Sequence, residues 1–79
     1  MEEYTSYEVL KDILSNWDIS ELYYFDFYKV GYTVRYGRKG YDYERKMNEE
    51  EFNKLLDVIK ILEQDMWIEI YENPELLEK

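Results

Sequence analysis

The fold is decided by residues 32–47, which read YTVRYGRKGYDYERKM. Apolar and polar residues alternate on both sides of the central residues 37–40, and this pattern predicts two half-buried strands joined by a turn. One register satisfies both faces of this hairpin, because apolar residues then lie opposite apolar ones and a basic residue lies opposite an acidic one. It pairs Tyr36 with Tyr41, Val34 with Tyr43, and Arg35 with Asp42.

A preceding strand is predicted over residues 22–30, which are dense in Tyr and Phe. Its register with the next strand stays open between two alternatives. A three-residue loop pairs Tyr28 with Tyr32 and Asp26 with Val34, whereas a two-residue loop pairs Phe27 with Val34 and Phe25 with Tyr36. The two registers exchange the faces of the strand. In either case the strand is apolar on both faces, which predicts a central place in the sheet or a partner on its second face.

Helices are predicted on both sides of these strands. Thr5 and Glu8 form a capping box before an apolar stripe, which predicts a helix over residues 6–16. Asn48 opens a second capping box, and the stripe after it predicts a helix from residue 49 to at least residue 64. The apolar residues expected to be nearly inaccessible are Leu14, Trp17, Val34, Leu55, Ile59 and Leu62.

The C-terminal residues allow two structures. Residues 66–72 either prolong the second helix or form a strand with Ile68 and Ile70 turned inward. Asn73 and Pro74 then predict a short helical turn. The sequence therefore predicts a single α+β domain over residues 1–79, in the order α-β-β-β-α. A three-stranded antiparallel meander packs against helices, and a short C-terminal helical turn follows.

Composition excludes several classes of function. The chain has no His and no Cys, so it lacks the usual near-neutral acid/base and the thiol nucleophile. No catalytic, cofactor-binding or metal-ligating residue is predicted, no cofactor is expected, and the chain is not expected to be an enzyme. The N-terminal residues show no signal-peptide pattern, and no apolar run is long enough to cross a bilayer. We therefore expect a cytoplasmic protein without a membrane partner.

The net charge of −9 is distributed unevenly. Residues 1–28 and 47–79 are acidic, whereas residues 29–46 are basic, and such a field steers charged partners. A rigid array of carboxylates can imitate the phosphates of a duplex and occupy the nucleic-acid groove of a basic protein. The acids expected to face a partner are Glu8, Asp12, Glu49, Glu50, Asp57, Glu63, Asp65 and Glu69.

These observations favour a small acidic protein-binding domain that mimics nucleic acid and inhibits a basic DNA- or RNA-handling protein. In size and composition the chain is similar to small acidic inhibitors encoded by phages and mobile elements, although no motif matches a particular family. On charge alone, the simpler interpretation is that the acidic surface serves solubility.

Two other functions stay open. The chain could form a homodimer or act as an adaptor through the second aromatic face of its sheet. It could also bind single-stranded nucleic acid through the basic hairpin, whose candidate residues are Arg35, Arg38, Lys39 and Arg45. Direct binding of nucleic acid is disfavoured, because most of the acids lie outside this segment and would repel a phosphate chain.

Overall fold

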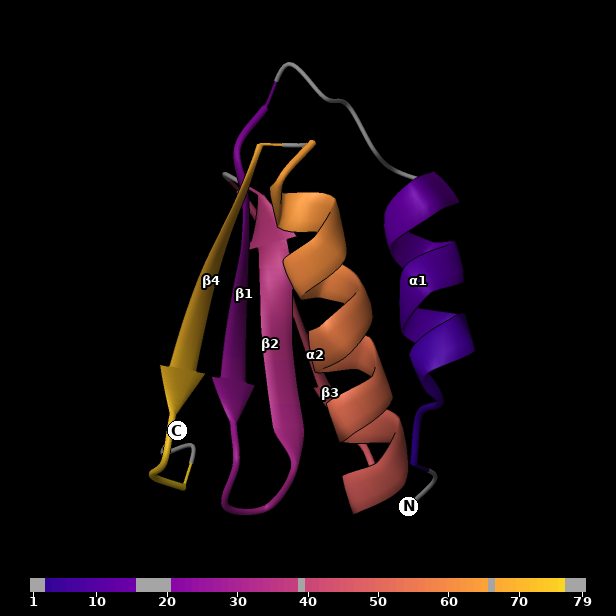
Figure 1. Cartoon of the computed structure of the whole chain (residues 1–79), viewed down its shortest axis with the longest axis vertical. Helices are drawn as coiled ribbons and strands as arrows, with labels where there is room; N and C mark the ends of the chain where they lie inside the picture. Colours follow the sequence, from indigo (N-terminus) through magenta and orange to yellow (C-terminus); the bar gives the residue numbers. More distant parts are fainter. Residues whose placement is uncertain (1–2, 16–20, 39, 66, 77–79) are drawn as a thin grey trace.

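The computed structural model describes residues 3–15, 21–38, 40–65 and 67–76. Within these residues the chain is α+β, as predicted, with two helices on one face of a four-stranded sheet (Figure 1). The helices are α1 (Ser6–Ser15) and α2 (Glu49–Glu63). The strands are β1 (Tyr23–Tyr28), β2 (Thr33–Arg38), β3 (Tyr41–Lys46) and β4 (Ile68–Asn73).

Both helices begin at the capping residues predicted from the sequence. The backbone N–H of Glu8 donates to Oγ1 of Thr5 (3.1 Å), and the backbone N–H of Glu51 donates to Oδ1 of Asn48 (2.8 Å). These side chains satisfy N–H groups that have no partner inside the helix. Helix α2 ends at Glu63, one residue earlier than predicted. The predicted end of the first helix at residue 16 lies outside the described residues.

The strand order is β3-β2-β1-β4. Strands β1, β2 and β3 form the predicted antiparallel meander, and β4 adds to the other edge of β1 in parallel. The sheet is therefore mixed, with a strand that the predicted three-stranded meander lacks. Strand β1 occupies a central position, as its two apolar faces predicted.

Strand β4 decides between the two structures considered for residues 66–72. Ile68 is buried and Ile70 is partly buried against the core, which is the inward pattern of the strand alternative. This strand satisfies the backbone groups along an edge of β1 that would otherwise be open. The predicted C-terminal helical turn is wrong for residues 74–76, because Asn73 is the last residue of β4 and these residues are irregular.

The first hairpin adopts one of the two predicted registers. Phe25 lies opposite Tyr36 and Phe27 lies opposite Val34, which turns the aromatic side chains of β1 toward the helices. The turn requires a left-handed backbone at Gly31 (φ 88°) and at Tyr32 (φ 48°). Burial of the apolar face therefore outweighs the poor turn chemistry that this register demands.

The predicted register of the second hairpin is wrong by two residues. Tyr36 lies opposite Tyr43 rather than Tyr41, and Arg35 lies opposite Glu44 rather than Asp42. The loop contains two residues instead of the four assumed from the sequence. A shift of two residues keeps every side chain on its predicted face, because side chains alternate with a period of two.

The core lies between the sheet and the helices. Val34, Leu55 and Ile59 are fully buried as predicted, whereas Leu62 is only partly buried. The prediction for Leu14 is wrong, since 61% of it is exposed. Helix α1 instead turns Val9 and Ile13 toward the sheet. Trp17 lies outside the described residues.

Candidate functional site

Six of the acids predicted to face a partner are exposed on the helices and on the turn after α2: Glu8, Glu49, Glu50, Asp57, Glu63 and Asp65. We call these residues the acidic helix surface. Helices α1 and α2 lie side by side and run in the same direction (Figure 1), so the two acidic arms of the sequence meet in one layer. Lys11, Lys54 and Lys60 are interspersed among the acids, and Glu49 accepts a hydrogen bond from the Tyr32 hydroxyl.

Few ion pairs neutralise the acidic helix surface. Lys54 contacts Glu50 and Glu51, with N–O distances of 3.5 and 3.2 Å. Exposed pairs of this kind contribute little to stability, about 0–1 kcal/mol. Asp57 and Glu63 are exposed and have no ion-pair partner within the described parts of the chain. Their charges therefore remain available to a partner.

The structure places two other predicted acids elsewhere. Asp12 of α1 faces the sheet and accepts a hydrogen bond from the Tyr36 hydroxyl (2.8 Å). Burial and this bond raise the pKa of Tyr36 well above its usual value. Glu69 lies on the opposite face of the sheet, where it accepts a hydrogen bond from the Tyr71 hydroxyl (2.5 Å). Asp12 and Glu69 thus do not belong to the acidic helix surface.

The basic residues of the hairpin are divided between the two faces of the sheet. Arg38 points toward the helix side, where its guanidinium forms an ion pair with Glu21 (2.7 Å) and stacks over the ring of Tyr41 at 4.9 Å. Arg35 is exposed on the other face. Lys39 lies outside the described residues. Of the described candidates, Arg35 and Arg38 therefore do not form one basic patch, because they lie on opposite faces of the sheet.

Arg45 also points toward the helices. Its guanidinium lies over the rings of Tyr4 and Tyr43, at 4.6 and 5.4 Å from their centroids, and 4.0 Å from the Asp12 carboxylate. The sequence contains a signal for this placement, because alternation puts Arg45 between Tyr43 and Met47 on the apolar face. The Arg45 guanidinium therefore makes its contacts within the protein, with Tyr4, Tyr43 and Asp12.

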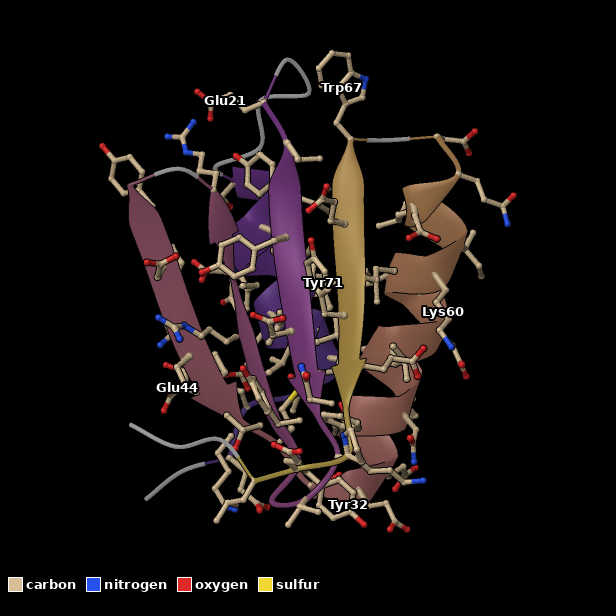
Figure 2. All side chains as sticks on the ribbon, turned by 90° about the vertical axis from the view of Figure 1, so that its left-hand side faces the viewer. Glu21, Tyr32, Glu44, Lys60, Trp67 and Tyr71 are labelled. Atoms are coloured by element: carbon tan, nitrogen blue, oxygen red, sulfur yellow. The ribbon has the colours of Figure 1, made fainter. Side chains whose placement is uncertain are left out.

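No helix lies on the sheet face that points away from α1 and α2, and of the described segments only the one that follows β4 passes across its lower end (Figure 2), where a Cβ atom on Gly31 would lie 3.1 Å from Cδ1 of Leu76. We call this sheet face the open face. It carries three tyrosines and four acids: Tyr24, Tyr28, Tyr71, Asp26, Asp42, Glu44 and Glu69. Burial and the hydrogen bond to Asp42 raise the pKa of Tyr24 to about 12. The homodimer or adaptor function that this face suggested stays a prediction.

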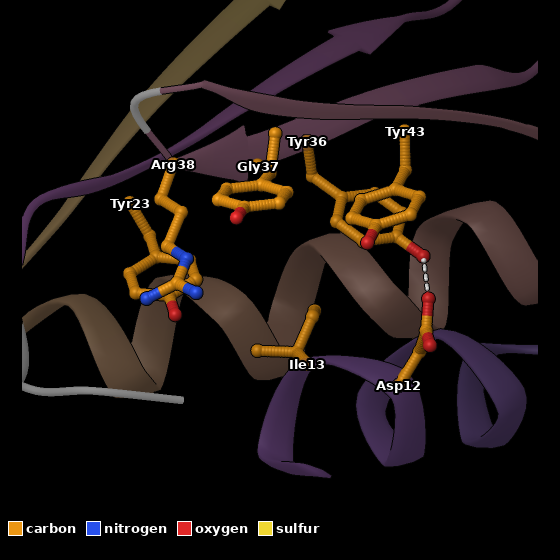
Figure 3. Close-up of a pocket in the computed structure, with 8 residues that line it drawn as sticks. Asp12, Ile13, Tyr23, Tyr36, Gly37, Arg38 and Tyr43 are labelled. Carbon is orange, nitrogen blue, oxygen red and sulfur yellow. Dashed lines mark hydrogen bonds between the residues drawn. The ribbon is translucent and has the colours of Figure 1, made fainter. Parts of the chain in front are cut away.

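A pocket of about 260 Å³ lies between α1 and the β2–β3 hairpin (Figure 3). Ile13 and Asp12 contribute from α1, and Gly37 and Arg38 from β2. The other lining residues are tyrosines: Tyr23, Tyr36, Tyr41 and Tyr43. The rings of Tyr36 and Tyr43 stack with their centroids 5.6 Å apart. We call this site the tyrosine pocket.

This pocket was not predicted from the sequence. One signal was present, because a glycine inside a strand often marks a place where another backbone approaches closely. A Cβ atom on Gly37 would lie 1.9 Å from the carbonyl oxygen of Tyr41. The residue is therefore required by the close approach of β3, which also brings Tyr41 to the rim of the pocket.

Comparisons with known proteins give no evidence about function. No protein-family model matches the chain, and no similar curated protein or solved structure was found. Within the described residues, neither α1 nor α2 is both long and apolar enough to cross a membrane.

Glu51 joins the two helices beneath the acidic helix surface. Its Oε1 atom accepts hydrogen bonds from the backbone N–H of Ser6 (3.0 Å) and from the Ser6 hydroxyl (3.1 Å). The Ser6 N–H bond, followed by the contact with Lys54, lowers the pKa of Glu51 below its usual value. The ionised carboxylate therefore holds the start of α1 against the start of α2.

This linkage predicts a pH-dependent effect of the Glu51→Gln substitution. A depressed carboxyl pKa stabilises the fold above the unfolded-state pKa, and this contribution is lost as pH falls through the folded-state pKa. The variant should melt below the wild type near neutral pH, and the two melting temperatures should converge on going from about pH 7 to about pH 3. Circular dichroism measures this gap. Glu63→Gln is the control and should leave the melting temperature unchanged, whereas a gap that is constant with pH would contradict the role of the Glu51 charge.

Proposed function

We propose that this chain is a non-enzymatic binding domain whose acidic helix surface docks onto a basic, nucleic-acid-handling protein and occupies its nucleic-acid site. One observation carries the proposal. Two acidic arms that are far apart in the sequence lie together in the helix layer, with exposed acids such as Asp57 and Glu63 that have no ion-pair partner among the described residues.

The attraction follows from ordinary electrostatics. A basic groove concentrates negative charge, and exposed charges act over roughly 8–10 Å near physiological ionic strength. Each carboxylate alone contributes modestly, so several must act together to give a useful affinity and on-rate. Carboxylates on rigid helices are held in place before binding, which lowers the entropic cost of docking.

The positions of the arginines support a protein partner over a nucleic acid. Arg38 is paired with Glu21, and Arg45 is held among tyrosine rings next to Asp12. Arg35 lies on the open face, which also carries four acids that would repel phosphates. Among the described candidate arginines, therefore, Arg38 and Arg45 are engaged within the protein and only Arg35 is exposed, which disfavours the single-strand-binding alternative.

A capture experiment tests this function. The chain is immobilised and exposed to a nuclease-treated bacterial lysate, and the retained proteins are eluted with duplex DNA or with increasing salt. We expect nucleic-acid-binding proteins to elute with both. Reversing Asp57 and Glu63 together to Lys should reduce their retention at least about tenfold, because these charges lie on the docking surface.

The matched control reverses Glu69 and Glu75 to Lys. This variant has the same net charge, but Glu69 lies on the open face and Glu75 follows β4, so retention should stay near the wild-type level. Equal losses in the two double variants would reduce the effect to net charge and contradict a defined surface. Elution by salt but not by DNA would contradict the mimicry of nucleic acid.

A further inference from the structure

The tyrosine pocket has an aromatic side, an apolar side and two polar ends. The tyrosine side chains come from the sheet, and Ile13 comes from α1 on the opposite side (Figure 3). Arg38 and Asp12 lie at opposite ends of the pocket in the same view. A ring that enters it would meet tyrosine on one side, an aliphatic side chain on the other, a hydrogen-bond donor at one end and an acceptor at the other.

The charges around the pocket are internally compensated. Arg38 is paired with Glu21 at 2.7 Å. Asp12 accepts a hydrogen bond from Tyr36 and lies 4.0 Å from Arg45. A ligand with a full charge of either sign would therefore find no uncompensated counter-charge, whereas an uncharged ligand would lose little solvation on entry.

A cationic ligand is disfavoured further by the arginines. Cations bind over the faces of aromatic rings, but Arg38 already lies over Tyr41 at 4.9 Å and Arg45 lies over Tyr43 at 5.4 Å. A second cation would lie beside two guanidinium groups. An anionic ligand would instead meet the net charge of −9 carried by the chain.

The size of the pocket limits the ligand to a small ring system. Its volume of about 260 Å³ lies just below the range of about 300–1,000 Å³ that is usual for drug-sized ligands. Uncharged heteroaromatic rings with donors and acceptors on one edge fit this description, and nucleobases are such rings. They also stack on tyrosine without regard to which base is present.

We propose that the tyrosine pocket binds an uncharged, planar heteroaromatic ring of the nucleobase type, presented as a nucleoside or free base rather than as a nucleotide. The ring stacks on the part of the exposed Tyr41 side chain that the Arg38 guanidinium leaves open, with its acceptors toward Arg38 and its donors toward Asp12. Carboxylate oxygens accept several hydrogen bonds, so the bond from Tyr36 is compatible with a further donor. This site is separate from the proposed protein-binding function, because Asp57 and Glu63 do not line it.

Titrations followed by ¹H–¹⁵N NMR test the proposal. The ligands are adenosine, guanosine, cytidine and uridine up to about 10 mM, with AMP and choline as the anionic and cationic arms. We expect nucleosides to shift the amide signals of Ile13 and Gly37 and of the lining tyrosines, and we expect AMP and choline to bind more weakly. Absence of nucleoside shifts, or stronger binding of choline, would overturn the proposal.

Substitutions then locate the ring. Tyr41→Ala should weaken nucleoside binding about tenfold, because base–tyrosine stacking is lost, and Tyr41→Phe should retain it. Tyr71→Ala is the matched control, since Tyr71 is similarly exposed but lies on the open face, and it should bind like the wild type. Equal losses in the two alanine variants, or a large loss in Tyr41→Phe, would show that stacking in the pocket does not bind the ligand.

Discussion

Substituting Ile59 with Ala is expected to destabilise the fold by about 2–5 kcal/mol. Ile59 is fully buried in the middle of α2, within the cluster that joins the helices to the sheet. Its truncation removes buried methyl groups and leaves a cavity that a close-packed core only partly fills. The free energy of unfolding of a small domain is about 5–15 kcal/mol, so the variant should lose a large part of its stability.

The control for this prediction is Ile61→Ala. Ile61 belongs to the same helix, two residues further on, but 65% of it is exposed. The change in helix propensity is the same at both positions and favours Ala by a few tenths of a kcal/mol, so this variant should be neutral or slightly more stable. Urea unfolding followed by circular dichroism measures both. A loss below about 0.5 kcal/mol at Ile59 would show that this side of α2 is not the core.

The fold class followed from local patterns that tertiary contacts did not override. Capping residues such as Thr5 and Asn48 mark the helix starts, and two-residue alternation marks β2 and β3. Register and strand order depend on contacts between distant segments, and these were predicted less well. Tyr36 pairs with Tyr43 because a tight two-residue loop replaced the longer one, while the period of two preserved the faces.

Strand β4 could not be placed from the sequence for a similar reason. Ile68 and Ile70 suit either a strand or the continuation of the helical stripe, and periodicity cannot separate these alternatives in so short a run. The strand is favoured because it pairs with the otherwise open edge of β1, and that edge exists only in the folded sheet. Leu14 is not a core residue because the buried side of α1 is the one that carries Val9 and Ile13, which lie one turn apart.

The acidic candidates were predicted from helical periodicity, and exposed acids such as Asp57 and Glu63 lie where it puts them. The hydrogen bond of Asp12 was not predictable, because its donor Tyr36 lies on a distant strand. The bond between Glu69 and Tyr71 is local, but the two side chains share a face only once residues 68–73 are known to form a strand. Tyrosine is large and polar at its tip, so a buried ring needs a nearby acceptor for its hydroxyl. Asp12 is such an acceptor for Tyr36, and it faces the sheet rather than the acidic helix surface.

A second large effect is expected at Gly37. A Cβ atom at this position would lie 1.9 Å from the carbonyl oxygen of Tyr41 and 3.1 Å from the Cα atom of Asp42. Both atoms belong to the backbone of β3, so a side-chain rotation cannot relieve the overlap and the two strands must move apart. Overpacking of this kind typically costs about 1–3 kcal/mol, and Gly37→Ala should lose at least that much stability.

The sign of the stability change in Gly37→Ala tests the overlap directly. Alanine is normally better than glycine inside a strand by roughly 0.5–1 kcal/mol, because glycine loses more conformational freedom on folding. Without the overlap, Gly37→Ala would therefore stabilise the protein.

The control is Gly40→Asn in the turn, where a Cβ atom meets nothing within 4 Å and asparagine tolerates the left-handed backbone at φ 87°. Urea unfolding should show a large loss for Gly37→Ala and a small one for Gly40→Asn. The separation of the strands should also reduce the near-ultraviolet dichroism from the stacked pair of Tyr36 and Tyr43, and a neutral or stabilised Gly37→Ala variant would contradict the close approach of β2 and β3.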